Sequence, residues 1–442
     1  MKEIDYSSKI IAKNSALSFL YKVVSMLLSF VSAPLLLKCL GEEKYGIWAT
    51  IGSLISWIYY SDLGIGSGLR NKLSISLGKK DIIAAKGYIA VAYLLLTVIS
   101  VVLFLAASII INIVDVSALL KIEASDENIN FCLVVALFFS CLNFVLSLAN
   151  NIAFSEQRAS LVSFFNLIGQ ALFVATLFIY YKYGLSLILY IAIGEGFTQA
   201  IKNVIETKYV FGKYPELKIR LSDAKKEYSK GILSFGILVF ISQISSLIHN
   251  TTDNLLISYY FGAADVTPYN FCFKYFNLIN TVYLVLLTPL ISAYAVANAK
   301  KDSAWIKKAM NRSTLLFAVF MLGTIVAIFV FRPFAHLWVG KELEYSSELI
   351  LFTALYFILL MLSHNTTSLQ TGMGDLKMAT LAVAVGAILN IPASIVFAVT
   401  LKFGVTGIVM GSVTSMIPVI MVGLYKYIYY YRKVNNHAEN RE

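Results

Sequence analysis

Long apolar segments separated by short polar breaks run through the whole chain. Twelve of these segments hold about 20 or more residues, which is enough to cross the hydrocarbon core of a bilayer. They lie at residues 15–37, 45–67, 87–114, 130–152, 162–181, 185–207, 231–260, 269–295, 313–337, 347–370, 378–400 and 404–430. Because lipid cannot hydrogen-bond to an open backbone, each segment is predicted to be a helix. The pattern therefore predicts an all-α integral membrane protein with twelve transmembrane helices.

Composition agrees with a chain that lies almost wholly in a membrane. Hydrophobic residues make up 58% and charged residues 14% of the 442 positions, and the mean hydropathy is +0.75. Soluble domains carry roughly 25% charged residues, and the breaks are too short for a separate soluble domain. Four cysteines lie scattered without a CxxC or other metal-ligand spacing, at Cys39, Cys132, Cys141 and Cys272. We therefore expect no metal site, no disulfide framework and no cofactor.

The net charge of +11 is distributed unevenly between the two predicted faces of the membrane. If the N-terminus is cytoplasmic, 26 of the 36 Lys and Arg residues fall in cytoplasmic segments and 7 fall in external ones. Such a bias is the positive-inside signal, and it predicts that both termini lie in the cytoplasm. The basic charge thus reflects topology, and no nucleic-acid partner is expected.

Short motifs recur about half the chain apart. Lys182-Tyr183-Gly184 returns as Lys402-Phe403-Gly404, in both cases at the break between two apolar segments. Three more pairs follow in the same order: Gly41 with Gly262, residues 78–81 with residues 299–302, and Arg158 with Lys377. All offsets lie between 219 and 221 residues. Matches in order at one spacing indicate a duplicated half.

With six predicted spans in each half, both halves enter the membrane from the same side. They are therefore expected to be parallel repeats with a binding site between them, as in many secondary transporters. The predicted parts are an N-terminal six-helix bundle (1–207), a cytoplasmic linker (208–230), a C-terminal six-helix bundle (231–430) and a cytoplasmic tail (431–442). In the last span, Gly407 and Gly411 form a GxxxG motif that permits close helix approach.

Two predicted spans carry a lysine inside a polar stripe. The first has Ser15, Ser18, Lys22, Ser25 and Ser29 at helical spacing, and the eighth has Asn270, Lys274, Asn277 and Thr281. Charged groups within a bilayer are costly and are kept away from lipid, so these stripes are expected to face a cavity. The alternative is that each lysine extends its ammonium group toward the nearer membrane surface.

Acidic residues occupy similar stripes on two other spans. Glu195 shares the sixth span with Gln199, Lys202 and Glu206, and Asp253 shares the seventh with Ser242, Ser246 and His249. Asp253 and Glu195 are candidates for ion coupling. The alternatives are that Lys202 and Glu206, four residues apart, form a structural ion pair, and that Asp253 only neutralises Lys274.

Several kinds of chemistry find no support in the sequence. No Walker A motif or nucleotide-binding domain is present, so ATP does not drive this chain directly. No Ser/His/Asp or metal-ligand constellation suggests an enzyme. The remaining hypothesis is movement of a ligand, coupled to an ion, to another solute or to nothing.

Four short motifs resemble a known family of membrane proteins. They are residues 40–48 (LGEEKYGIW), residues 62–71 (DLGIGSGLRN), residues 156–158 (EQR) and residues 252–257 (TDNLLI). These segments resemble the bacterial O-antigen and polysaccharide flippases of the multidrug/oligosaccharidyl-lipid/polysaccharide exporter superfamily. The likeness covers essentially the whole chain and implies a fold like that of the MATE transporters, with two six-helix bundles.

The resemblance implies transfer of an undecaprenyl-pyrophosphate-linked oligosaccharide from the inner to the outer leaflet of the bacterial inner (plasma) membrane. Such a substrate needs cationic groups for its pyrophosphate and hydroxyl or amide groups for its sugars. The candidate cavity residues are Lys22, Ser25, Arg70, Asn270, Lys274 and Asn277. We expect alternating access between the halves, with H+ or Na+ as candidate coupling ions at Asp253 or Glu195. Candidate partners besides the lipid bilayer are a polysaccharide polymerase and chain-length proteins.

Three other functions remain open from the sequence. A cation-coupled multidrug antiporter of the same superfamily would need carboxylates in its cavity, whereas the first span carries a lysine and no acidic residue in its core. A flippase for the peptidoglycan precursor would differ only in the glycan it carries. A non-transporting scaffold would have no use for costly charged stripes. An anionic, lipid-linked ligand is favoured.

Overall fold

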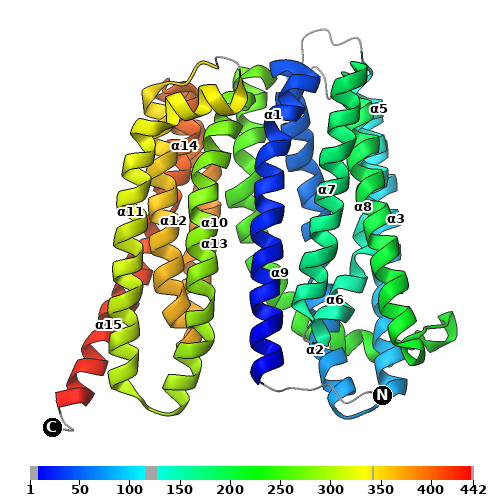
Figure 1. Cartoon of the computed structure of the whole chain (residues 1–442), viewed down its shortest axis with the longest axis vertical. Coiled ribbons are helices and arrows are strands. Elements are labelled where there is room, and N and C mark those ends of the chain that lie inside the picture. The colour runs from blue at the N-terminus through cyan, green and yellow to red at the C-terminus, as the bar shows by residue number, and fades with distance from the viewer. Residues whose placement is uncertain (1–7, 115–126, 157, 341–342, 440–442) are drawn as a thin grey trace. The chain divides into compact units, whose positions relative to one another are not determined.

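A computed structural model describes residues 8–114, 127–156, 158–340 and 343–439. Every secondary-structure element in these residues is helical. The chain divides into two compact units, Met1–Leu247 and Ile248–Glu442. In Figure 1 the long helices of each unit run side by side. The predicted all-α membrane architecture is confirmed.

The first unit contains the helices up to the beginning of α9. They are α1 (Ser8–Tyr60), α2 (Ile65–Gly78), α3 (Ile82–Ile113), α5 (Ile129–Leu146), α6 (Leu148–Ser155), α7 (Ala159–Tyr183), α8 (Ile188–Lys213), the short 3₁₀ helices η1 (Pro215–Leu217) and η2 (Leu221–Asp223), and α9 (Lys226–Phe261). Helix α9 continues into the second unit, whose first residue is Ile248. The remaining helices are α10 (Ala263–Ala299), α11 (Ser303–Val339), α12 (Ser347–Met373), α13 (Lys377–Ile395), the π-helical turn η3 (Val396–Thr400), α14 (Gly404–Ser415) and α15 (Ile417–Glu439).

Nine helical stretches in the described residues are long and apolar enough to cross a membrane. The first of them, Ala16–Tyr60, covers two of the spans predicted from the sequence. Gly41 interrupts it with a left-handed backbone, φ 77° and ψ 178°, which glycine adopts without steric cost. Helices α8 and α9 correspond to the sixth and seventh predicted segments but are not among the nine. The count of twelve spans therefore stays a prediction.

The two units repeat the same local backbone geometry at the duplicated motifs. Asp81 caps α3 by accepting a hydrogen bond from the backbone N–H of Ala84 at 2.9 Å, and Asp302 caps α11 through Trp305 at 3.0 Å. The lysine before each aspartate has a positive φ, 58° at Lys80 and 54° in its counterpart. A positive φ is uncommon for a residue other than glycine. Its recurrence before a capping aspartate in both units supports the duplication.

The segment 208–230 is folded against the first unit. Leu217, in η1, is 1% exposed and lies in the same apolar cluster as Leu69 of α2 and Ile232 of α9. Gly68 makes room for this contact, since a Cβ there would lie 2.3 Å from the backbone carbonyl oxygen of Ile232. The stretch predicted to link the two bundles is thus held by apolar burial in the first unit.

In the second unit, α14 packs closely on the helix that precedes it. A Cβ on Gly407 would lie 2.4 Å from the backbone of Ala398, and a Cβ on Gly411 would lie 2.3 Å from the backbone nitrogen of Ser394. The GxxxG motif therefore supports close packing of α14 against α13 and η3 within one unit.

Candidate functional site

Helix α1 carries the first predicted polar stripe. Lys22 is exposed, and the Ser25 hydroxyl donates to the carbonyl of Tyr21 on its own helix at 2.8 Å. Ser18 is buried, with its hydroxyl 2.8 Å from that of Ser163 on α7. Ser18 of the stripe therefore packs within the first unit, whereas Lys22, one turn further along α1, stays exposed. The side chain of Ser15 lies outside the described residues.

Helix α10 brings the second lysine stripe together. Asn270, Lys274 and Asn277 are all half-buried on this helix. The Asn277 side-chain oxygen is 3.4 Å from the Nδ2 of Asn280, and its backbone carbonyl accepts from the hydroxyl of Thr281 at 2.8 Å. Their spacing of four and three residues places Asn270, Lys274 and Asn277 on one face of α10.

Arg70 lies about one and a half turns into α2 and is exposed. Its guanidinium carbon is 4.9 Å from the centre of the Phe154 ring, a cation–π contact. Asp62 has a structural task instead, because it accepts hydrogen bonds from the backbone N–H groups of Gly64 at 2.8 Å and Gly66 at 3.1 Å. Asp62 thus satisfies free backbone N–H groups at the start of α2, whose N-cap residue is Gly64, while Arg70 keeps an accessible charge.

Two helices of the first unit are interrupted beside one another. The chain breaks at residues 61–64 before α2, and Ser147 separates α5 from α6. A cavity of about 220 Å³ lies at these breaks; its lining includes Tyr59, Asp62, Ser67, Ser147 and Asn151. Discontinuous helices are a recurring way to place polar groups at membrane depth.

Asp253 is the centre of a buried polar network in the second unit. The carboxylate is 5% exposed and accepts hydrogen bonds from the Tyr269 hydroxyl at 3.0 Å and the Ser412 hydroxyl at 3.1 Å. Ser412 in turn accepts from the Nδ2 of Asn390 at 3.0 Å, and the Thr252 hydroxyl donates to that amide's oxygen at 3.0 Å. Neutral groups from four helices therefore converge on one carboxylate. The side chains of Ser242, Ser246 and His249 lie outside the described residues.

Helix α8 holds the other acidic stripe. Lys202 and Glu206 are 3% and 1% exposed, and their charged groups are 3.7 Å apart. The Lys202 ammonium also donates to the side-chain oxygen of Asn166 at 3.0 Å. The predicted ion pair is confirmed, and it lies inside the first unit. Glu195, about two turns before Lys202 and three before Glu206 on α8, is half-buried.

Glu156 follows α6, at the end of the first unit that the charge bias assigns to the cytoplasm. It is 5% exposed, and its Oε2 is 3.6 Å from the Nε of Arg158. Burial raises the pKa of this carboxyl to about 7, although the Tyr214 hydroxyl and the Arg158 charge act in the opposite direction. This carboxyl therefore changes its charge near neutral pH.

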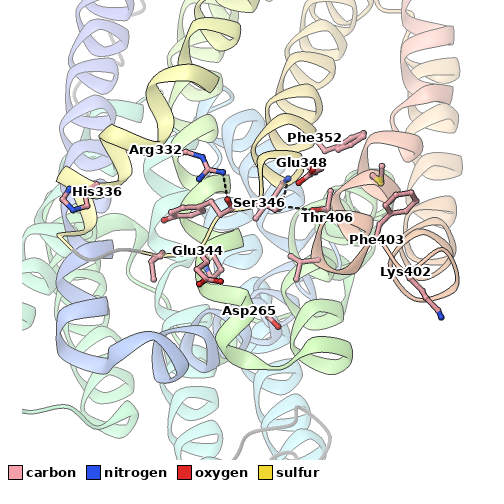
Figure 2. A pocket seen from close by; sticks show the side chains of 16 residues that line it. Asp265, Arg332, His336, Glu344, Ser346, Glu348, Phe352, Lys402, Phe403 and Thr406 are labelled. Carbon is pink, nitrogen blue, oxygen red and sulfur yellow. Dashed lines mark hydrogen bonds between the residues drawn. The ribbon is translucent and has the colours of Figure 1, made fainter.

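A larger cavity, of about 1220 Å³, lies in the second unit. Its side chains come from the first turns of α10, the end of α11, the segment before α12 with the first turns of that helix, and the turn before α14 with the first turns of that helix (Figure 2). The predicted topology assigns all four of these ends to the external face. The charged lining residues are Asp265, Arg332, His336, Glu344, Glu348 and Lys402.

Hydrogen bonds between helices hold the rim of this cavity. The Arg332 guanidinium donates to the carbonyl of Tyr345 at 2.8 Å (Figure 2). It also donates to the hydroxyl of Ser347 at 3.1 Å. The hydroxyl groups of Ser346 and Thr406 are 3.3 Å apart, which joins α12 to α14. Side-chain hydrogen bonds therefore fix the positions of Tyr345, Ser346 and Ser347 at the rim.

Sequence reasoning did not find this cavity, nor the partners of Asp253. Tyr269, Asn390 and Ser412 come from three helices, and no spacing along the chain brings them together. The sequence carries one signal for the cavity, the repeated Lys402-Phe403-Gly404 turn, because Lys402 and Phe403 line it.

Comparison with protein families gives two matches. The family described as "Polysaccharide biosynthesis protein" matches residues 11–295, and the family described as MatE matches residues 239–396. A protein of Salmonella typhimurium named as an O-antigen transporter is 26% identical over 414 residues, which cover 92% of this chain and 94% of the relative. A protein of Yersinia pseudotuberculosis named as an O-antigen export protein is 23% identical and covers 90% of each chain.

Solved structures show the same fold. An inward-facing multidrug resistance MATE family transporter of the MOP superfamily has a TM-score of 0.70, with 15% identity over 96% of each chain. A MOP superfamily transporter from Pyrococcus furiosus, described by the reverse polarity of its binding pocket, has a TM-score of 0.66 with 16% identity over 96% of each chain.

Proposed function

Since this chain belongs to the family of polysaccharide biosynthesis proteins, we propose that it is a flippase for an undecaprenyl-pyrophosphate-linked oligosaccharide, an O-antigen or another polysaccharide repeat unit. The observation that carries the proposal is the family match over residues 11–295, together with relatives named as O-antigen transporters along nearly the whole chain. The substrate would pass from the inner to the outer leaflet of the bacterial inner membrane.

The substrate's chemistry gives the candidate cavity residues their roles. Lys22 and Lys274 would attract the pyrophosphate, since an ammonium group binds phosphate as a compact charge. Ser25, Asn270 and Asn277 would offer hydroxyl and amide groups to the sugars. Support comes from the exposed side chain of Lys22 and from the spacing that places Asn270 and Asn277 on the same face of α10 as Lys274. Arg70, also accessible, would make the first contact with the pyrophosphate in the inner leaflet.

We infer that transport proceeds by alternating access of two six-helix bundles with both termini in the cytoplasm. The duplicated caps at Asp81 and Asp302 support two equivalent halves. The lipid tail would remain in the bilayer while the pyrophosphate and glycan cross through the protein.

Ion coupling, by H+ or Na+, is assigned to Asp253, with Glu195 as the second candidate. The support for Asp253 is that its described hydrogen-bond donors, Tyr269 and Ser412, are neutral. A buried carboxylate with neutral donors is costly to keep charged, so uptake of a proton or a cation is favourable. Protonation would replace an accepted hydrogen bond with a donated one, and the network would have to rearrange.

The competing functions differ in their ligand. A multidrug antiporter would share the fold of the MATE structures, but those likenesses are below 20% identity, whereas the relatives with the named O-antigen function cover nearly the whole chain. A peptidoglycan-precursor flippase would use the same pyrophosphate chemistry. The names of the curated relatives favour the O-antigen substrate.

Substitution of the two lysines tests the proposal. Lys22→Ala and Lys274→Ala should each reduce flipping of a fluorescent lipid-linked oligosaccharide in vesicles by at least tenfold, while membrane abundance stays normal. Lys182→Ala, at an exposed break between helices, is the matched control and should flip normally. An arginine at either position should restore part of the rate, because the charge returns. Wild-type rates in both alanine variants would contradict the assigned roles.

The function itself has a separate test in cells. Deleting the gene should make the lipid-linked oligosaccharide accumulate in the inner leaflet, and the identity of that glycan would name the substrate. Accumulation of the peptidoglycan precursor instead would favour the second flippase hypothesis.

A further inference from the structure

The large cavity of the second unit (Figure 2) has a chemistry different from that of the lysine stripes. We propose that this cavity is a binding site for sugar rings of the glycan, and that it takes hydroxyl-rich, uncharged sugars and not the pyrophosphate. The inference rests on the proposed function, because it assigns a second contact to the same substrate. We call the cavity the glycan pocket below.

The mixed charges of the pocket suit a neutral sugar better than a pyrophosphate. Asp265, Glu344 and Glu348 contribute three carboxylates, and each can accept hydrogen bonds from hydroxyl groups. The Arg332 guanidinium already donates to the segment before α12, so part of its hydrogen-bonding capacity is used by the protein. The same lining holds Arg332 and Lys402, so a pyrophosphate would meet like charges as well as opposite ones, whereas sugar hydroxyls can form charge-assisted hydrogen bonds with groups of either sign.

Aromatic rings supply the second element of sugar recognition. Tyr345, Phe352 and Phe403 line the pocket, and Phe403 is 51% exposed. The C–H face of a sugar ring is apolar and slightly positive, so it packs on the negative face of an aromatic ring. Figure 2 places Phe352 and Phe403 on the same side of the hollow, near Glu348 and Thr406. Rings and carboxylates thus occur within one cavity.

The backbone before α14 presents Phe403 in a specific way. The π-helical turn η3 closes with a hydrogen bond from the backbone N–H of Leu401 to the carbonyl of Val396 at 2.9 Å. Lys402 and Gly404 then have φ values of 61° and 60°, so the chain turns sharply on both sides of Phe403. π-Helical turns occur often at functional sites. Here the turn displays an apolar ring at a polar cavity.

The pocket is large enough and sufficiently fixed to be a binding site. Its volume of about 1220 Å³ exceeds the range of roughly 300–1,000 Å³ that is usual for small-molecule sites. It therefore has room for several sugar rings. The contacts of Arg332 with Tyr345 and of Ser346 with Thr406 hold the rim before any ligand arrives, which lowers the entropic cost of binding.

The duplication provides matched controls for the test. Lys182-Tyr183-Gly184 in the first unit is the counterpart of the turn that carries Phe403, and Tyr183 is 69% exposed. Removing its ring changes the same motif outside the glycan pocket. Glu43, exposed near the Gly41 break, is a matching carboxylate that the predicted topology assigns to the same face as Glu348.

The experiment uses the purified full-length protein in lipid nanodiscs. The probe is the free oligosaccharide that mild acid releases from the lipid-linked repeat units of the source cell, without lipid or phosphate. Binding is measured by saturation-transfer NMR. Phe403→Ala and Glu348→Gln should each weaken binding at least fivefold, whereas Tyr183→Ala and Glu43→Gln should bind as the wild type does. Inorganic pyrophosphate should not displace the oligosaccharide.

Flipping of the lipid-linked substrate is measured in parallel, and thermal unfolding confirms that each variant is folded. If the wild type flips but does not bind the free oligosaccharide, or if both pocket variants bind it normally, the glycan pocket is refuted and the proposed function stands. Displacement by pyrophosphate would refute the stated ligand class. If the wild type neither binds nor flips, the proposed function itself fails.

Discussion

The network around Asp253 predicts that one substitution at this position lowers stability and that another affects transport alone. Two substitutions are compared: Asp253→Ala removes the carboxylate, and Asp253→Asn keeps its size and one acceptor oxygen. In the wild type, the hydroxyls of Tyr269 and Ser412 both donate to this carboxylate. Alanine leaves both donors without their acceptor in a region where Tyr269 is 4% and Ser412 1% exposed.

The magnitudes follow from the number of orphaned groups. A buried donor without an acceptor costs about 1–3 kcal/mol, so alanine should lower the free energy of unfolding by about 2–6 kcal/mol. A change of 1 kcal/mol shifts the Tm of a domain of this size by roughly 2–4 °C. Asparagine can still accept from Tyr269 and removes a costly buried charge. Its free energy of unfolding should therefore stay within about 1–2 kcal/mol of the wild type.

Thermal unfolding in nanodiscs measures the first effect, and flipping in vesicles with and without an imposed pH or sodium gradient measures the second. Asparagine should fold normally but lose the response to the gradient. Asp375→Asn, which breaks a partly exposed ion pair with Lys426 in the same unit, is the control and should change the free energy of unfolding by less than about 1 kcal/mol. If alanine is as stable as the wild type, the network does not stabilise the unit. If asparagine still responds to both gradients, Asp253 is not the coupling site.

Two further predictions concern packing and pH. Gly411→Ala should destabilise the second unit by about 1–3 kcal/mol, because its Cβ would lie 2.3 Å from the backbone nitrogen of Ser394. Gly323→Ala, with open space around its Cβ, should be neutral or stabilising in a melting experiment, and equal melting temperatures for both would contradict the close packing. For Glu156, burial raises the pKa from 4.5 to about 7 in the folded state, so stability should fall as pH rises from about 4.5 to 7, by at most about 3 kcal/mol. Glu156→Gln should remove that slope between pH 5 and pH 8, and an unchanged slope would show that another group causes it.

The helical membrane architecture was predictable because its cause is local. Apolar length and the requirement for internal hydrogen bonds act on each segment separately, so a single sequence reveals them. The same holds for Lys202 and Glu206, which lie one helical turn apart and therefore had to be neighbours. The recurring turn at Gly184 and Gly404 was also predictable. Both glycines have a positive φ, and both follow a basic and an aromatic residue in the sequence.

The candidate site was less predictable because tertiary contacts form it. Asp253 was recognised as a buried charge, but Ser412 lies 159 positions away and could not be assigned to it. The glycan pocket is built from helix ends. Polar residues are common wherever a span leaves the membrane, so their presence there does not by itself predict a binding site. The segment 208–230 is predicted to join the two bundles because it lies between the sixth and seventh spans. The apolar packing of Leu217 depends on tertiary contacts that the charge of this segment does not reveal.

The ion pair on α8 has a consequence for how the protein is made. Lys202 and Glu206 belong to one helix, so their attraction is available as soon as that helix exists. The segment can leave the ribosome and partition into lipid with its two charges already matched. During cotranslational insertion these two charges need no partner from another helix to neutralise them, and the contact of Lys202 with Asn166 of α7 can form afterwards.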